Sequence, residues 1–176
     1  MANNSLISDK MNAALNEQIG NEMSASMQYI AIAAYFDSED LLELARHFYR
    51  QSEEERTHAL RFLKFVVDAG ASVEMGALPQ PQNRFNLAEE AIQKALDGEI
   101  TVTRQINALV DMATRENDHI THNFLQWFVT EQLEEVSSTS TLLKIVQRAG
   151  ESNLLMVEEY LVRNGRLGAE PEASST

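Results

Sequence analysis

Apolar residues recur every three or four positions through most of this chain, with polar residues between them. This spacing places the apolar side chains along one face of an α-helix. We expect four long helices and a short fifth one, at about residues 8–36, 40–69, 86–113, 117–149 and 153–162. Alternation of apolar and polar residues, which would indicate strands, is scarce. The pattern therefore predicts an all-α protein.

Polar residues and glycines suited to helix ends lie between these segments. Residues 37–40, Asp-Ser-Glu-Asp, can end the first helix and cap the second. Asn86 can cap the third helix, and Glu89 three residues later would complete a capping box. Gly70 and Gly150 are typical C-terminal stops for the second and fourth helices.

The lengths of the connections predict the topology. Short links join the first helix to the second and the third to the fourth, so each pair is expected to be an antiparallel hairpin. Residues 70–85, which include Pro79 and Pro81, form a much longer link. A helix of about thirty residues spans roughly 45 Å, and sixteen extended residues reach about 50 Å. The link can therefore cross the length of a four-helix bundle and start the third helix parallel to the second.

Composition fits one compact domain over residues 1–176, with a loose tail expected at residues 165–176. The net charge of −13, from 27 acidic and 14 basic residues, disfavours nucleic acids and anionic membranes as partners and favours cations. The absence of cysteine excludes disulfides, thiolate-bound zinc and iron–sulfur clusters. Residues 1–11 lack the pattern of a signal peptide, and no apolar run is long enough to span a bilayer. We expect a cytoplasmic protein.

Acidic residues interrupt the apolar stripe near the middle of each long helix. The interrupting residues, at similar distances from the two hairpin turns, are Glu22 in the first helix, Glu55 and His58 in the second, Glu99 in the third, and Glu131, Gln132 and Glu135 in the fourth. Residues three apart share a helix face, so the second helix can offer a carboxylate and an imidazole to one metal ion. All four helices thus predict one polar level in the core.

Several carboxylates in an apolar interior repel one another, and each loses hydration at a cost of several kcal/mol. They must either take up protons or surround a multivalent cation, and the inner stripes contain few bases. Carboxylate oxygens with one imidazole suit iron or manganese better than calcium. The sequence therefore predicts a pair of metal ions inside the bundle.

Three segments resemble signature segments of the bacterial non-haem ferritins. They are residues 15–22 (LNEQIGNE), 53–58 (EEERTH) and 123–135 (NFLQWFVTEQLEE). The resemblance covers about residues 11–149. It implies a ferritin-like four-helix bundle with one long crossover between the second and third helices and a short fifth helix. It also implies a ferroxidase that oxidises Fe²⁺ with O₂ or H₂O₂ and stores ferric mineral inside a hollow homo-oligomeric shell of 24 subunits.

The same resemblance implies roles for individual residues. Glu22, Glu55 and His58 would hold the first iron, with Glu55 bridging to a second iron held by Glu99 and Glu135, with Gln132 beside it. Glu54, Glu131 and Glu134, together with Glu135, resemble an additional third iron site. Tyr29 would supply an electron or a hydrogen bond, and Trp127 matches a neighbouring aromatic residue.

Departures from related families narrow the expected function. Bacterioferritins and di-iron oxygenases repeat the Glu-x-x-His motif on the fourth helix, but Glu134 and Ser138 stand where that histidine would be. Arg56 occupies the position of the haem-ligating methionine of bacterioferritins, so we expect no haem. Two alternatives remain at this stage: a structural or mineral-nucleating cage without catalysis, and a mini-ferritin that protects against oxidative damage.

Overall fold

The structure is a computed structural model that describes residues 5–165. It contains α1 (Asp9–Ser38), α2 (Leu42–Asp68), α3 (Ala88–Glu116), α4 (His119–Ala149) and α5 (Leu154–Gly165), with one 3₁₀ turn, η1 (Glu151–Asn153), before α5. The prediction of an all-α chain with four long helices and a short fifth one is confirmed. The expected loose tail, beyond residue 165, lies outside the described residues.

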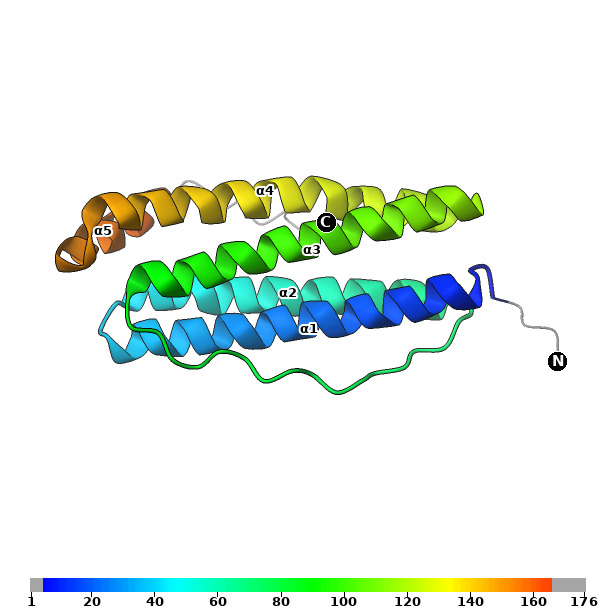
Figure 1. Cartoon of the computed structure of the whole chain (residues 1–176), viewed down its shortest axis with the longest axis horizontal. Coiled ribbons are helices and arrows are strands. Elements are labelled where there is room, and N and C mark those ends of the chain that lie inside the picture. Colours follow the sequence, from blue (N-terminus) through cyan, green and yellow to red (C-terminus); the bar gives the residue numbers. More distant parts are fainter. Residues whose placement is uncertain (1–4, 166–176) are drawn as a thin grey trace, which may run out of the picture.

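The helices form two antiparallel hairpins, α1 with α2 and α3 with α4, packed into one bundle (Figure 1). The long link leaves the end of α2, runs back along α1, and starts α3 at the opposite end, so α3 runs parallel to α2 as predicted. α5 lies at the end of the bundle where α2 and α3 begin. None of the helices in residues 5–165 combines the length and apolar character needed to cross a bilayer.

Two amide side chains on α1 hold the crossover against the bundle. Asn16 donates to the carbonyl of Ser72 at 3.0 Å and accepts from the backbone N–H of Glu74 at 2.7 Å. Farther along α1, Gln28 makes the equivalent pair of bonds with the backbone of Gln82, at 3.0 and 2.9 Å. Because each amide both donates and accepts, it satisfies backbone groups that an extended segment would otherwise leave to water.

Two separate apolar cores fill the bundle, one toward each end. The core nearer α5 includes Phe36, Phe48, Ile92 and Val146. The core at the far end includes Met11, Phe62, Ile106 and Leu125. The buried glutamates lie between them in all four helices; in α3, for example, Glu99 separates Ala95 of one core from Val102 of the other.

The expected local caps of α2 and α3 are wrong. The N-cap residues are Leu41 and Leu87, and neither provides a side-chain cap. Asn86 does not cap α3, because its backbone and side-chain N–H groups donate to Glu90 instead. The prediction that glycines follow the ends of α2 and α4 is confirmed. Gly70 follows the last turn of α2, Gly150 follows the last residue of α4, and both have positive φ.

Carboxylates from the C-terminal segment cap these two helices instead. Glu158 of α5 accepts from the backbone N–H groups of Glu43 and Leu44, both at 2.8 Å. Glu151 of η1 accepts from the first N–H groups of α3, at 3.2 and 3.3 Å. A carboxylate at a helix N-terminus satisfies free donors and interacts favourably with the helix dipole. Together with the buried Val157, these bonds fix α5 across the end of the bundle.

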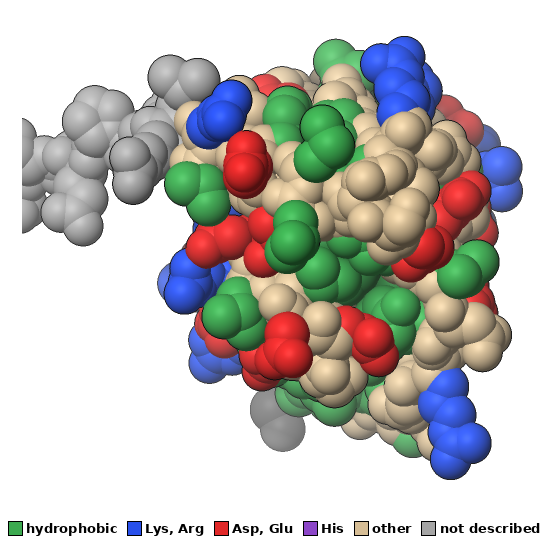
Figure 2. Space-filling view, turned by 90° about the vertical axis from the view of Figure 1, so that its left-hand side faces the viewer, with side chains coloured by type: hydrophobic (Ala, Val, Ile, Leu, Met, Phe, Trp, Pro, Cys, Tyr) green, Lys and Arg blue, Asp and Glu red, His purple; other side chains and the backbone are tan. Residues whose placement is uncertain are grey.

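The end covered by α5 carries exposed apolar side chains among charged ones (Figure 2). Leu42, Leu87, Leu155 and Met156 are each about half exposed or more. They come from the starts of α2 and α3 and from α5. This end is therefore less polar than the net charge of the chain suggests.

We expect Glu158→Ala to loosen α5, because it removes both bonds to the start of α2. The free energy of local opening should fall by about 1 kcal/mol, which makes the open state of α5 roughly fivefold more populated. Amide hydrogen exchange in α5 and in the first turn of α2 would measure it. Glu159→Ala is the matched control, since Glu159 is exposed and pairs with Arg163 within α5. Equal exchange in the two variants would show that the cap does not hold α5.

Candidate metal centre

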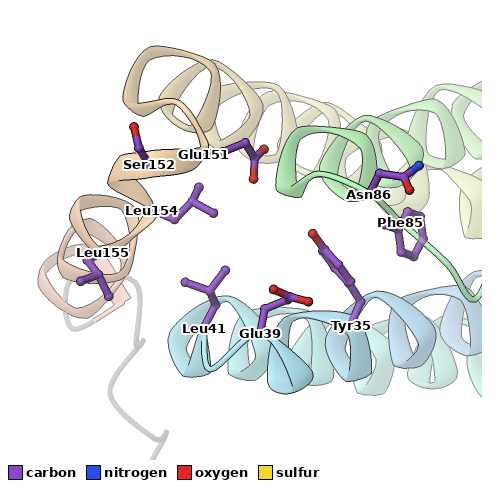
Figure 3. Close-up of a pocket in the computed structure, with 9 residues that line it drawn as sticks. All are labelled: Tyr35, Glu39, Leu41, Phe85, Asn86, Glu151, Ser152, Leu154 and Leu155. Carbon is purple, nitrogen blue, oxygen red and sulfur yellow. The ribbon is translucent and has the colours of Figure 1, made fainter.

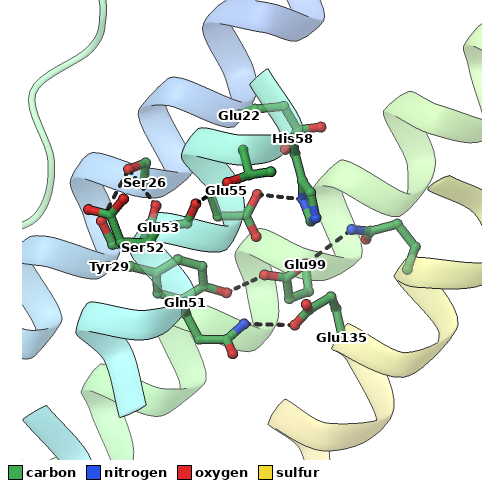
Figure 4. A network of polar contacts seen from close by, with 12 residues as sticks. Glu22, Ser26, Tyr29, Gln51, Ser52, Glu53, Glu55, His58, Glu99 and Glu135 are labelled. Carbon is green, nitrogen blue, oxygen red and sulfur yellow. Dashed lines mark hydrogen bonds and ion pairs between the residues drawn. The ribbon is translucent and has the colours of Figure 1, made fainter. Parts of the chain in front are cut away.

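Six predicted site residues meet in one layer halfway along the bundle (Figure 4). We call this set the polar layer, and all of its side chains are buried. Its members are Glu22 from α1, Glu55 and His58 from α2, Glu99 from α3, and Gln132 and Glu135 from α4. Each stands where the helical repeat would otherwise place a core residue, which is why four helices deliver polar groups to one level.

The first half of the layer consists of Glu22, Glu55 and His58. One potential ligand atom from each lies within 4.8 Å of the others, and His58 Nδ1 lies 3.4 Å from Glu55 Oε2. Glu22 Oε2 and both carboxylate oxygens of Glu55 have no hydrogen-bond partner. Unpaired buried oxygens of this kind are costly. The donor set of oxygens and one imidazole nitrogen therefore fits a divalent cation.

The second half consists of Glu99, Gln132 and Glu135, and its carboxylates are hydrogen-bonded. The hydroxyl of Tyr29 donates to Glu99 Oε1, and Gln132 Nε2 donates to Glu99 Oε2 at 3.3 Å. Gln51 Nε2 donates to Glu135 Oε2 at 2.8 Å. The two halves thus differ: the first has bare oxygens, and the second has oxygens already paired with protein donors.

Burial and mutual repulsion raise the pKa values of the carboxyl groups. Burial raises the pKa of Glu22 well above its usual range, and the charge of Glu55 adds to the effect. Burial also raises the pKa of Glu55 strongly, with Glu99 next in importance. The pKa of Glu135 rises to about 7, mainly through burial and then the charge of Glu99. Near neutral pH the layer therefore resists holding all its charges unless a cation enters it.

Tyr29 lies in the layer beside Glu99. Burial and then the negative charge of Glu99 raise the pKa of Tyr29 well above its usual value, so its hydroxyl stays protonated and can donate. Its ring stacks on Phe48, with 5.7 Å between centroids.

Two aromatic rings pack against the imidazole of His58. Trp127 and Phe128 meet the imidazole edge-on, with ring centroids 5.4 and 5.8 Å away. Arg61 lies over the Trp127 ring, 3.9 Å from its centroid, an arrangement typical of a cation–π contact. These contacts fix the plane of the imidazole. Trp127 therefore neighbours the layer as expected.

The three acids of the expected third site lie at the solvent margin of the layer. Glu54 and Glu131 are half-buried and Glu134 is exposed. Burial raises the pKa of Glu54, which also interacts with Glu131. Within residues 5–165, the group of candidate ligands that the structure brings together is Glu22, Glu55 and His58, and it includes none of these acids.

Sequence reasoning missed three residues that support the layer: Gln18, Gln51 and Thr103. Gln18 Nε2 donates to Glu22 Oε1 at 2.9 Å, and the Thr103 hydroxyl donates to Gln132 Oε1 at 2.8 Å. Gln18 and Gln51 each lie one helical turn before a predicted ligand, so a polar residue on the apolar stripe could have revealed them. Thr103 carries no such signal, since it is only half-buried.

Two surface hollows lie outside the layer. One, of about 320 Å³, lies at the α5 end and is lined by residues that include Tyr35, Glu39, Phe85, Glu151 and Leu154 (Figure 3). The other lies at the opposite end, around the turn between α3 and α4. Neither of these two hollows contains a residue of the polar layer.

Comparisons of sequence and of structure with known proteins all find similarity to ferritins. A family model for ferritin, described as a ferritin-like domain, matches residues 12–149. The chain is 42% identical over 174 residues to ferritin BfrB of Mycolicibacterium smegmatis, covering 98% of this chain and 96% of that protein. It is 35% identical over 155 residues to the bacterial non-heme ferritin of Staphylococcus aureus, covering 88% and 93%. An open pore ferritin from Archaeoglobus fulgidus has a similar structure, with a TM-score of 0.86, 35% identity and coverage of 89% and 96%.

We expect Glu55→Gln to stabilise the metal-free protein at alkaline pH, because there it replaces a buried charge that accepts no hydrogen bond with a neutral amide. The gain should be on the order of 1 kcal/mol, or roughly 2 to 4 °C in melting temperature. Folding raises the pKa of Glu55, so wild-type stability falls as pH rises through that raised value. Glutamine does not titrate, and the gain should therefore grow with pH.

Thermal unfolding at several pH values and one protein concentration would test this. Glu53→Gln is the matched control, because Glu53 is an exposed acid on the same helix. Divalent cobalt should raise the melting temperature of wild type more than that of Glu55→Gln. A variant less stable than wild type at alkaline pH would contradict the expectation.

Proposed function

This chain belongs to the ferritin family of iron-storage proteins, and we propose that it oxidises ferrous iron within its own helix bundle and stores the ferric product. The observation that carries the proposal is the first half of the polar layer. There, three buried carboxylate oxygens without a hydrogen bond lie beside an imidazole. Such a group is costly without a cation and suits iron with it.

A pair of iron ions is the natural complement of the layer. Glu22, Glu55 and His58 would hold the first ferrous ion, and Glu99 and Glu135 the second, with Gln132 beside it. Both oxygens of Glu55 are free of hydrogen bonds, so this carboxylate can bridge the two ions. Carboxylates stabilise the higher charge of ferric iron, which favours oxidation over simple binding.

The electron count also favours a pair. Two ferrous ions supply two electrons, which reduce one O₂ with two protons to the level of hydrogen peroxide, or one H₂O₂ with two protons to water. Neighbouring ions can deliver both electrons to the same oxidant. Tyr29, whose hydroxyl donates to Glu99, would supply a hydrogen bond or a further electron.

We extend the proposal to the remaining predictions for the site and its assembly. Glu54, Glu131 and Glu134, with Glu135, would hold a third iron at the margin of the layer. The protein would assemble as a hollow shell of 24 copies without haem. Exposed apolar side chains on α1, α2 and the crossover support self-association, namely Met27, Ile30, Tyr49, Leu60, Val67, Met75 and Leu78.

The test is stopped-flow absorbance after the metal-free protein is mixed with two ferrous ions per subunit in air. Wild type should form ferric product much faster than buffer alone. Glu22→Ala and His58→Ala should each slow the initial rate at least about tenfold, the loss typical even of residues that only support a metal ligand. Native mass spectrometry should show that both variants still assemble.

Glu53→Ala serves as the control, because it removes an exposed acid from α2 and should keep the wild-type rate. Wild-type rates in Glu22→Ala or His58→Ala would refute the assignment of the site. A wild-type rate equal to that of buffer would instead favour a cage that binds iron without oxidising it.

A further inference from the structure

The two halves of the polar layer are supported differently. In the first half three of the four carboxylate oxygens have no hydrogen bond, and Gln18 donates to the fourth, Glu22 Oε1. In the second half an amide donor holds each carboxylate: Gln132 holds Glu99, and Gln51 holds Glu135. The affinity of the second half for a metal ion should therefore depend on these supporting donors as well as on its ligands.

Gln51 supports Glu135 from across the bundle. It is a buried residue of α2, one turn before Glu55, and it reaches α4 to donate to Glu135 Oε2 at 2.8 Å. A carboxylate offers about four lone pairs on two oxygens. Glu135 can therefore keep this bond while it binds a metal ion, and the bond selects one orientation of its side chain.

Thr103 supports Glu99 indirectly, through Gln132. Its hydroxyl lies 2.8 Å from Gln132 Oε1 and 2.8 Å from the backbone oxygen of Glu99. When the hydroxyl donates to Gln132 Oε1, the amide nitrogen of Gln132 is directed toward Glu99 Oε2. In that arrangement Thr103 and the Glu99 carboxylate favour the same orientation of the Gln132 amide.

We propose that Gln51 and Thr103 are positioning residues for the second metal position, where they orient Glu135 and, through Gln132, Glu99. They set the affinity of that position for a divalent ion and leave the first position unaffected. This inference rests on the proposed two-ion site. Neither residue touches the metal; each acts through a ligand or through its neighbour.

Anaerobic titration of the metal-free assembled protein with Co²⁺ tests the inference without any oxidation step. Calorimetry gives the two affinities, and the visible absorbance of bound Co²⁺ reports the coordination. Wild type should bind two ions per subunit within the polar layer, apart from any ion at the third site, and the tighter of the two should lie at Glu22, Glu55 and His58. Gln51→Leu and Thr103→Val should each weaken only the second ion, by about tenfold or more. Thr103→Ser keeps the hydroxyl and should bind as wild type does.

Matched controls exist on the solvent face of α3. Gln93→Leu removes an exposed amide that donates to Asp97, and Thr101→Val removes an exposed hydroxyl bonded only locally, to the backbone of Asp97. Both should keep the wild-type affinities. Melting temperature and native mass establish that every variant is folded and assembled before its affinities are compared.

The outcomes separate this inference from the proposed function. If wild type binds two ions and both Gln51→Leu and Thr103→Val bind them equally well, the positioning role is overturned and the two-ion site stands. Equal weakening of both ions would also overturn it, because that result indicates a general structural defect. If wild type binds fewer than two ions per subunit, the proposed two-ion site fails, and the positioning role fails with it.

Discussion

Between its two apolar cores the bundle buries the carboxyl groups of Glu22, Glu55, Glu99 and Glu135 beside His58. Each group has lost most of its hydration, and each repels the others, so the raised pKa values follow directly. The apolar packing on both sides holds the four helices in register against this repulsion. The crossover, the hairpins and the two cores all serve to bring these side chains to one level.

The buried carboxylates of the chain fall into two groups, which differ in their hydrogen-bond partners. Glu99 and Glu135 accept hydrogen bonds from Tyr29, Gln132 and Gln51, which makes their burial tolerable without a metal. Glu55 has no such partner on either oxygen. A buried oxygen with no protein donor has nothing to compensate its lost hydration, so Glu55 depends more on a neighbouring positive charge than Glu99 and Glu135 do.

The α5 end of the molecule provides an internal comparison. Glu151 and Glu158 also meet other parts of the chain there, but backbone N–H groups at the starts of α3 and α2 satisfy them. A helix N-terminus supplies partial positive charge, so these carboxylates need no cation. Carboxyl groups thus cap helices at one end of the bundle, whereas at mid-height the carboxyl group of Glu55 accepts no hydrogen bond. The difference lies in the donors that surround it.

Sequence periodicity by itself determined the helices, the crossover and the level of the polar layer, because each follows from local spacing and chain length. The interruption of four apolar stripes by acids also identified the side chains that share the layer, although their role as metal ligands stays a prediction. Only the tertiary structure decided that Glu151 and Glu158 cap distant helices, that Gln51 reaches Glu135, and that Thr103 contacts Gln132. These are contacts between residues far apart in the chain, and side-chain direction, which spacing does not encode, determines which donor meets which oxygen.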